Sequence, residues 1–285
     1  MSDARFELAL LGGRVGVILY DVEEPFATMA FAEIEREAVR LQKVFNLYDP
    51  QSELSLLNAR RTMAVSDELL VVLRRALEYA AITGGAYDIS KGRQFLARKR
   101  GVEHEVGCSY REILIKGNNV SLLHPDALID LGSIAKGYIG DRLLSFIHAL
   151  GIESAFVDVR GDLVIGGHEL EVVDIAHPRE PGSSIGSIVL ENLAVATSGD
   201  YRQYVGSFER SHIVAETDLI SVTAVHESLL EADAIASAVF VSGSRRFSEI
   251  LALVPKAFVL AMDRGGRILK NMPPKEGLVL AFGGM

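Results

Sequence analysis

The residues best suited to chemistry in this sequence lie between Asp130 and Asp141, in the segment DLGSIAKGYIGD. A glycine beside a helix start lets a ligand approach the backbone, and the unpaired N–H groups of a first helical turn donate to phosphate oxygens. Lys136 adds a positive charge in that turn. The segment therefore predicts an anion-binding loop, although it lacks the glycine-lysine-hydroxyl order of a Walker loop. The alternative is a tight loop-to-helix junction whose lysine is solvated.

A second candidate lies on a predicted helix, where Asp233 and Ser237 stand four residues apart among alanines. On a helix their oxygen atoms project from one face. Mg2+ and Ca2+ prefer oxygen ligands and retain waters in the rest of the shell, so this pair is half of a hard-cation site. The alternative is a small-residue helix packed closely on a neighbour, with Ser237 bonded to its own turn.

Polar side chains also follow a predicted buried strand, in the run ATSGDYR that contains Ser198 and Asp200. Strand ends of this kind often present polar groups to a cleft, but the run is equally compatible with a turn. His212 has the residue type of a general base, because the ordinary pKa of histidine lies near neutrality. A lone histidine is more often structural.

Two further segments follow predicted helices and carry several polar side chains. The segment 48–58 reads YDPQSELSLLN, contains a turn, and offers Ser52 as a helix cap. The segment 84–88 reads GGAYD. Taken separately, the first is compatible with a plain helix-to-helix connection and the second with a helix stop.

The composition is that of an ordinary folded chain and excludes several classes of protein. The 285 residues are 49% hydrophobic and 24% charged, which excludes a disordered or fibrous chain. A net charge of −9 argues against non-specific binding to nucleic acid. Because Cys108 is the single cysteine, neither an intrachain disulfide nor a zinc ribbon can form.

The amino end shows neither a secretory signal nor a lipid-anchor cysteine. No window offers about 18 uncharged apolar residues in a row, the minimum for a membrane helix. If the sequence is the complete gene product, we expect a soluble cytoplasmic protein.

Hydrophobic periodicity predicts helices and strands that are mixed without strict alternation. Several strand pairs are predicted as hairpins, which favours an α+β fold with mixed, largely antiparallel sheets flanked by helices. We expect a single unit over residues 1–285 with two lobes, and a mobile loop over 177–184. The predicted helices are 26–45, 67–81, 134–150, 229–241 and 246–253. The predicted strands are 6–11, 15–20, 113–115, 120–122, 155–157, 163–165, 171–175, 187–190, 220–225, 258–262 and 267–270.

Taken in this order, the polar segments resemble the motifs of the ApbE family of FAD:protein FMN transferases. Residues 48–58 resemble its YDPxSELSxLN, 84–88 its GGAFD, 130–138 its DLGGIAKGY, 196–202 its ATSGDYR, and 232–237 its ADALAT. Five ordered matches are far more specific than any one of them.

The resemblance implies a two-lobed, T-fold-like architecture and a cytoplasmic, magnesium-dependent transferase. Such an enzyme moves FMN from FAD to a threonine of an acceptor flavoprotein and releases AMP. Metal neutralisation of developing charge and a positioned acceptor are the main needs of that chemistry.

The resemblance also assigns roles to individual residues. The metal would be held by the carbonyl of Ala135 with Asp233 and Ser237, and Lys136 would meet the pyrophosphate. His212 matches the histidine of the family's HIIDPRTG and is the candidate catalytic residue. The remaining residues expected to contact FAD are Tyr48 and Glu53 near the flavin or ribityl end, Asp88 by the nucleotide, and Ser198 and Asp200 in the cleft.

This chain departs from the family pattern at several positions. After His212 it continues IVAET, so the aspartate, proline and terminal glycine of HIIDPRTG are missing. Ser133 and Arg160 stand where the family usually has glycine, and Ser237 replaces a threonine while keeping a hydroxyl. Two alternatives therefore stay open: a non-catalytic FAD-binding protein of the same fold, and a pyrophosphatase that splits FAD into FMN and AMP.

Overall fold

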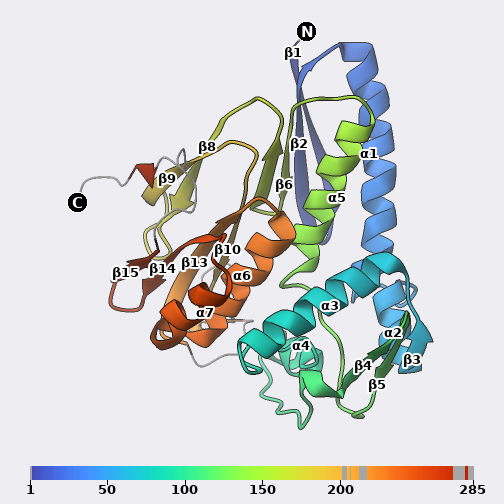
Figure 1. Ribbon diagram of the computed structural model, residues 1–285, viewed down its shortest axis with the longest axis vertical. Coiled ribbons are helices and arrows are strands. Elements are labelled where there is room, and N and C mark those ends of the chain that lie inside the picture. Colours follow the sequence, from blue (N-terminus) through green and yellow to red (C-terminus); the bar gives the residue numbers. More distant parts are fainter. Residues whose placement is uncertain (1, 201–203, 206, 212–216, 272–279, 282–285) are drawn as a thin grey trace.

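An eight-stranded antiparallel sheet forms the centre of the computed structural model, which describes residues 2–200, 204–205, 207–211, 217–271 and 280–281. Its strand order is β1-β2-β6-β7-β10-β13-β14-β15, and each of these pairings is antiparallel (Figure 1). The strands are β1 (Ser2–Leu10), β2 (Gly13–Val22), β6 (Ala155–Val159), β7 (Asp162–Gly166), β10 (Ala194–Gly199), β13 (Leu219–His226), β14 (Phe258–Asp263) and β15 (Ile268–Lys270).

Helices cover one face of this sheet. They are α1 (Glu24–Phe45), α5 (Ala135–Ala149), α6 (Leu229–Ser242) and α7 (Phe247–Leu253). Along α1, apolar residues recur at the three-and-four spacing that puts them on one stripe, and this stripe is buried against the sheet and α5. Helix α6 is different, because it is apolar and buried nearly all round. A helix of that kind lies in the core, so the polar residues that it does carry are held in a low-dielectric surrounding.

A second group of elements lies beside the large sheet (Figure 1). It contains a small sheet of order β3-β5-β4, in which both pairings are antiparallel. The elements are α2 (Glu53–Arg60), β3 (Thr62–Ala64), α3 (Asp67–Ile82), α4 (Gly92–Lys99), a 3-10 turn (Tyr110–Glu112), β4 (Ile113–Lys116) and β5 (Asn119–Leu122).

A third sheet covers part of the other face of the large sheet. It has the order β16-β9-β8, from β8 (Glu171–Ala176), β9 (Ser184–Leu190) and β16 (Leu280–Ala281). Apolar side chains of β8 and β9, such as Ile175 and Ile188, are buried in one cluster with Val195 and Phe258 of the large sheet. The part of the large sheet beneath β8 and β9 is therefore buried on both faces. A separate pair consists of β11 (Tyr204–Val205) and β12 (Ser207–Ser211).

The predicted α+β class with largely antiparallel sheets is confirmed, as are all five predicted helices. Helices α2 and α4 and strand β3 were not predicted as elements, because each is short and carries too few apolar residues to show a period. The cap at Ser52 is confirmed, since its Oγ accepts the N–H of Ser55 at 3.1 Å. Helix α3 packs against α6 and α1.

Two glycines allow α5 and α6 to approach closely. A Cβ atom at Gly137 would lie 2.4 Å from the carbonyl oxygen of Leu229, and one at Gly140 would lie 2.5 Å from the Leu229 side chain. Only a residue without a side chain fits between the two backbones at Gly137. This contact places the first turn of α5 directly against the first turn of α6, and both turns carry candidate site residues.

Within the residues described, no helix is both long and apolar enough to cross a membrane.

We expect Gly137→Ala to destabilise the protein by about 1–3 kcal/mol, because an added methyl group must push α6 away from α5. In an unpacked helix the same substitution stabilises by about 0.5–1 kcal/mol, so the sign of the change is diagnostic. Urea unfolding of the two proteins measures it. An unchanged or higher midpoint for the variant would show that the helices are not held at this distance.

Candidate active site

Two buried carboxylates meet one ammonium group at the start of α5. Lys136 Nζ forms an ion pair with Asp162 and a second one, at 3.1 Å, with Asp233 Oδ1. The other oxygen of Asp233 accepts the N–H of Gly137 at 3.2 Å, and Asp162 Oδ1 accepts that of Thr197 at 3.3 Å. The alternative of a solvated Lys136 is therefore wrong. We call Lys136, Asp162 and Asp233 the acidic triad.

Each member of the acidic triad is positioned by a different element. Lys136 lies in the first turn of α5, Asp233 lies on α6, and Asp162 is the first residue of β7. The turn before β7 has Arg160 at φ 61° and Gly161 at φ 91°. Arg160 thus adopts the left-handed conformation that favours glycine, which accounts for glycine being usual at this position. Its guanidinium donates to the carbonyl of Leu11 at 2.7 Å.

The acidic triad contains two carboxylates and one ammonium group. Burial of the excess negative charge costs free energy, because a charge is poorly solvated in the protein interior. Burial raises the pKa of the Asp233 carboxyl to about 6, the nearby Lys136 opposes this rise, and the charge of Asp162 adds to it. Burial by itself would lower the pKa of Lys136, but the two carboxylates raise it above its ordinary value. The lysine therefore stays charged, and Asp233 is the member that titrates near neutral pH.

Most amides around the start of α5 already have protein acceptors. Gly132 donates to Asp130 Oδ1 at 2.7 Å, and the amides of residues 134 and 135 both donate to the carbonyl of Leu131. The expectation of several free amides for an anion is wrong for these positions, because the tight turn satisfies its own N–H groups. Ser133, at another usual glycine position, donates its hydroxyl to the Tyr87 oxygen at 2.8 Å.

A pair of hydroxyl groups connects α6 with strand β10 beneath it. Ser237 lies one turn after Asp233 on α6, and its Oγ lies 2.9 Å from that of Ser198 on β10. The structure thus brings together two predicted residues that are far apart in sequence. Ser237 is bonded to β10 rather than to its own helical turn, so that part of the alternative is wrong, whereas the close packing of this small-residue helix on a neighbour is found against α5.

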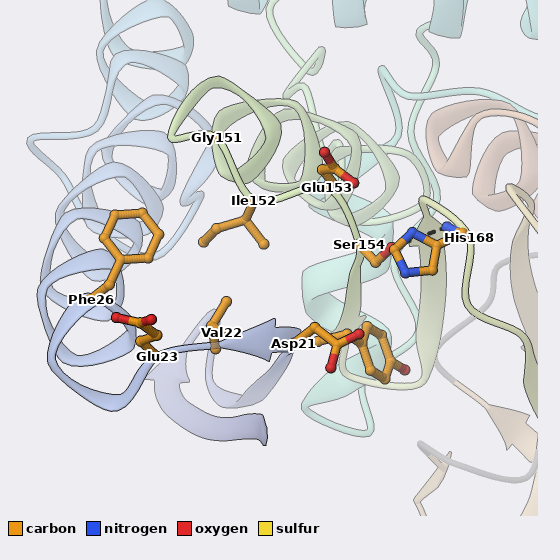
Figure 2. Close-up of a pocket in the computed structure, with 10 residues that line it drawn as sticks. Asp21, Val22, Glu23, Phe26, Gly151, Ile152, Glu153, Ser154 and His168 are labelled. Carbon is orange, nitrogen blue, oxygen red and sulfur yellow. Dashed lines mark hydrogen bonds between the residues drawn. The ribbon is translucent and has the colours of Figure 1, made fainter. Parts of the chain in front are cut away.

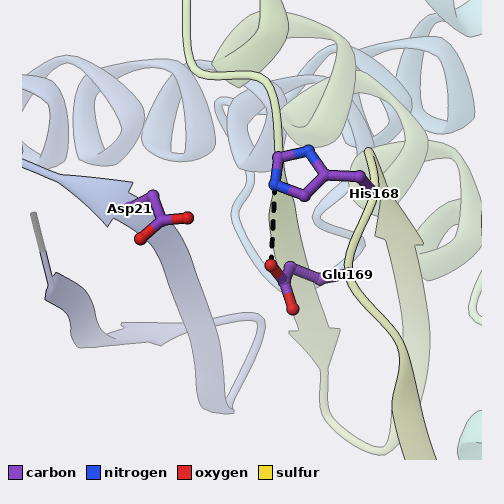
Figure 3. A group of neighbouring side chains, drawn as sticks. All are labelled: Asp21, His168 and Glu169. Carbon is purple, nitrogen blue, oxygen red and sulfur yellow. Dashed lines mark ion pairs between the residues drawn. The ribbon is translucent and has the colours of Figure 1, made fainter.

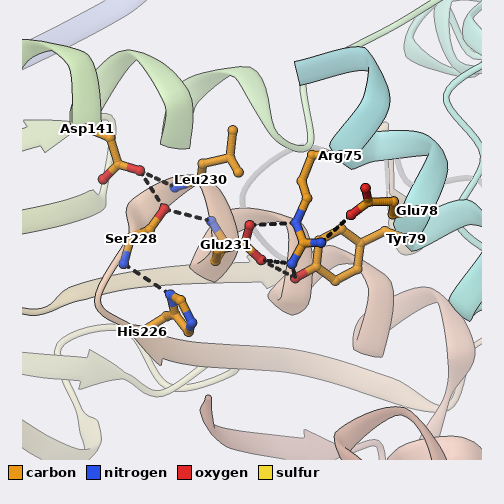
Figure 4. Close-up of polar contacts among 8 residues, drawn as sticks. All are labelled: Arg75, Glu78, Tyr79, Asp141, His226, Ser228, Leu230 and Glu231. Carbon is orange, nitrogen blue, oxygen red and sulfur yellow. Dashed lines mark hydrogen bonds and ion pairs between the residues drawn. The ribbon is translucent and has the colours of Figure 1, made fainter. Parts of the chain in front are cut away.

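The amino end of α6 is anchored by a carboxylate from α5 (Figure 4). Asp141 accepts the hydroxyl of Ser228 at 2.6 Å and the amides of Leu229 and Leu230 at 2.7 and 3.0 Å. A carboxylate at a helix amino end satisfies free N–H groups and interacts favourably with the helix dipole. Burial raises the pKa of Asp141, and these hydrogen bonds oppose the rise.

A second anchor of α6 comes from α3 (Figure 4). Glu231 accepts the guanidinium Nε of Arg75 and the hydroxyl of Tyr79, both at 2.6 Å. Glu231 lies two residues before Asp233, so the two anchors fix the turn of α6 from which Asp233 projects. Neither Asp141 nor Glu231 was singled out from the sequence, because nothing local to the chain indicates their partners.

Asp200, at the end of the polar run after β10, is held by the loop between β8 and β9. Its two carboxylate oxygens accept the guanidinium of Arg179 at 2.8 and 2.7 Å. A bidentate pair of this kind fixes the orientation of both groups. The loop predicted to be mobile is thus attached to the large sheet at this point. Asp200 reaches a cationic partner rather than only ending a turn.

Three other predicted FAD contacts are engaged by their own neighbours. Glu53 accepts the amide and the hydroxyl of Ser66 at 2.5 and 2.7 Å, next to the cap of α3. Asp88 accepts the amide and the hydroxyl of Ser90 and the amide of Tyr110. Tyr48 is exposed and accepts a hydrogen bond from Lys99 Nζ at 3.0 Å. Their contacts hold loops together, and their roles toward FAD stay predictions.

Asp162 is the site residue that sequence reasoning missed. The sequence pattern places it only between the predicted strands 155–157 and 163–165. The one local indication of Asp162 is that it follows a glycine turn and begins a buried strand. The partners of Asp162 are distant in sequence, because Lys136 lies 26 residues away and Asp233 is farther still. His212, the predicted catalytic residue, lies outside the described residues, so its role also stays a prediction.

Sequence comparison relates the chain to one family. The ApbE family model matches residues 11–259. A relative from Vibrio cholerae, named FAD:protein FMN transferase, is 27% identical over 277 residues, covering 82% of this chain and 80% of the relative. A protein of the same name from Treponema pallidum is 27% identical over 272 residues, covering 75% and 74%.

Solved structures show the same fold. The ApbE protein of Thermotoga maritima superposes with a TM-score of 0.82 at 24% identity, covering 95% of this chain and 97% of that one. The flavin transferase ApbE of Vibrio cholerae gives a TM-score of 0.79 at 20% identity, covering 96% and 97%. The architecture derived above is therefore shared with these proteins.

We expect Lys136→Met to destabilise the protein by about 3–5 kcal/mol, because it leaves two buried carboxylates without their cation. The double variant Lys136→Met/Asp162→Asn should recover part of this loss, since it has one buried charge fewer. Chemical denaturation gives both values. Lys116→Met, at an exposed position, is the control and should change stability by no more than about 0.5 kcal/mol. Equal stability of the Lys136 variant and the control would contradict a buried triad.

Proposed function

Because the chain belongs to the ApbE family, we propose that it is an FAD:protein FMN transferase, which moves FMN from FAD to a threonine of an acceptor flavoprotein and releases AMP. The observation that carries this proposal is the acidic triad at the junction of α5 and α6. Two buried carboxylates and one ammonium leave an excess of negative charge, which favours binding of a cation beside a polyanionic substrate.

The reaction needs one bond formed and one broken at the FMN phosphorus. The threonine oxygen of the acceptor attacks that phosphorus, the bond to the bridging oxygen breaks, and AMP leaves with that oxygen. The threonine proton must pass to a base, for which His212 is the candidate by family resemblance. Positioning of the two substrates and stabilisation of charge on the phosphoryl oxygens account for most of the catalysis in such transfers.

The residues around Asp233 fit a divalent cation in their donor chemistry. Asp233 supplies a carboxylate, Ser237 a hydroxyl on the same face of α6, and both are the oxygen ligands that Mg2+ prefers. Ala135 begins α5, so its carbonyl ordinarily accepts the N–H four residues ahead and would use its second lone pair for a metal. A bound Mg2+ would supply charge neutralisation on the phosphoryl oxygens.

Lys136 then has two roles that differ between the free and the loaded protein. In the structure its ammonium neutralises Asp162 and Asp233, so it is not free to bind an anion. A divalent cation on Asp233 would weaken that ion pair and release Lys136 toward the pyrophosphate of FAD. We propose that the two cations replace one another at Asp233, and that Ser198 and Asp200 line the side of the cleft formed by β10.

We expect the purified protein, given FAD, Mg2+ and a threonine-bearing acceptor flavoprotein, to produce AMP and a covalently flavinylated acceptor in equal amounts. Asp233→Asn should lower the rate at least about 100-fold, because it removes the anionic ligand of the cation. Asp126→Asn, with a side chain that is 49% exposed, is the matched control and should leave the rate unchanged. Nucleotide chromatography and mass spectrometry of the acceptor measure the two products.

The other outcomes of this experiment separate the alternatives. AMP and free FMN without a labelled acceptor would identify an FAD pyrophosphatase. Intact FAD recovered from a protein that binds it tightly would identify a non-catalytic binding protein. Either result would reject the transferase proposal.

We expect Mg2+ affinity to depend on pH through Asp233. The raised pKa of about 6 means that the carboxyl is protonated, and so a poor ligand, in the acid range. The dissociation constant should therefore rise by about tenfold per pH unit below pH 6 and level off above it. Isothermal titration calorimetry from pH 5 to pH 8 measures this curve. In Asp233→Asn the affinity should be weak throughout, and a flat curve in the unaltered protein would argue against Asp233 as a ligand.

A further inference from the structure

A cavity of about 470 Å3 lies at the end of β2, away from the acidic triad (Figure 2). Its walls come from the end of β2, the start of α1 and the loop between α5 and β6. Asp21 and His168 lie on one side of it, and Phe26 and Ile152 on another. The cavity thus has an apolar part and a part lined by groups that bind cations.

Three potential metal ligands meet at this edge of the cavity (Figure 3). One donor atom each of Asp21, His168 and Glu169 lies within 4.8 Å of the other two. His168 Nε2 is 3.5 Å from Glu169 Oε1. The donors come from two separate chain segments, the end of β2 and the loop after β7. We propose that Asp21, His168 and Glu169 form a second cation site, which binds a transition-metal dication such as Zn2+.

The register of the sheet separates this site from the acidic triad. Asp162 starts β7 at the turn where it pairs with Val159, whereas Gly166 at the other end of β7 pairs with Ala155. Asp21 lies beyond Leu19, which also pairs with Ala155. Gly166 lies four residues after Asp162 on β7, and each residue of a strand rises about 3.3 Å, so the two sites are separated by about 13 Å or more. A cation here would not share ligands with one bound at Asp233.

The orientation of His168 suits metal binding. Its Nδ1 lies 2.8 Å from the hydroxyl oxygen of Ser154, which also accepts the backbone N–H of His168 at 3.0 Å. A metal-binding histidine ordinarily uses its second ring nitrogen in such a hydrogen bond, which fixes the tautomer and the ring plane. In the metal-bound form, Nδ1–H would donate to Ser154, and Nε2 would present its lone pair on the side where Glu169 lies. Gly167 makes this approach possible, because a Cβ there would lie 2.2 Å from Ser154 Oγ.

The site also has an excess of negative charge. Among the ion pairs of the described residues, Asp21 has none and Glu169 pairs only with His168. Burial raises the pKa of the nearby Tyr20 hydroxyl, and the charges of Glu171, Asp3 and Glu169 raise it further. A field of this sign attracts a cation and stabilises it beside neutral imidazole.

The donor set selects the kind of metal. Imidazole favours Zn2+ and its transition-metal neighbours over Mg2+ and Ca2+, which prefer oxygen ligands alone. Zn2+ binds nitrogen and carboxylate oxygen at about 2.0–2.2 Å, so the three donors must move closer together on binding. Asp21 is exposed and Glu169 is partly exposed, so their side chains can turn toward the His168 ring by that amount. Three protein ligands leave a fourth position for water on the cavity side.

Zn2+ titration of the full chain in excess Mg2+ tests the site, with calorimetry and metal analysis after dialysis. We expect one bound Zn2+ that persists in Asp233→Asn. His168→Asn and Asp21→Asn should each weaken binding at least about 10-fold, and Ser154→Ala by about 10-fold through the orientation of His168. Two controls should retain the affinity: Glu153→Gln, which lines the same cavity, and His104→Asn, an exposed histidine between α4 and β4.

Circular dichroism establishes that each variant is folded, so that a loss of Zn2+ reports on the site. The proposal is overturned if the unaltered protein binds no Zn2+, or if the His168 variant binds it as well as the unaltered protein does. It is also overturned if His104→Asn loses as much affinity as His168→Asn, or if Zn2+ is lost only in Asp233→Asn.

Discussion

The placement of Lys136 between two buried carboxylates depends on how closely α5 and α6 approach one another. Gly137 brings the α5 backbone against the carbonyl of Leu229, and the same residue donates its amide to Asp233. The contact that packs the two helices is therefore also a contact within the site. Because buried charges are stable only with partners and hydrogen bonds, the helices, the strand start at Asp162 and the lysine must be held together in one arrangement.

The anchors of α6 follow from this requirement. The helix is apolar nearly all round, so packing alone would leave its rotation about its own axis weakly determined. Asp141 from α5 binds its first amides, and Glu231 pairs with Arg75 of α3. These polar contacts fix the direction in which Asp233 and Ser237 project. The large sheet supplies the remaining side of the site. Asp162 starts strand β7, and Ser198 lies near the end of strand β10.

The same sheet carries different chemistry at its two ends. At the triad end, buried oxygen donors with a lysine suit a hard cation beside phosphate groups. At the far end of β2, a histidine and two carboxylates at the edge of a cavity suit a softer dication. The two donor sets differ in burial: the first is shielded from water, whereas in the second Asp21 and His168 are exposed, and Asp21 has no ion-pair partner among the described residues.

The amino-acid sequence determined the helices and strands with a clear hydrophobic period, the α+β class, and the order of the polar motifs. It also placed Asp233 and Ser237 on one helical face, because that relation depends on four-residue spacing alone. Only the tertiary structure decided which charges meet: Asp162 and Asp233 lie 26 and 97 residues from Lys136. Pairing over such separations is set by the packing of α5, α6 and the sheet, so no local pattern indicates it. The same holds for Glu53 and Asp88, which resemble ligand contacts in the sequence but bind neighbouring loops in the fold.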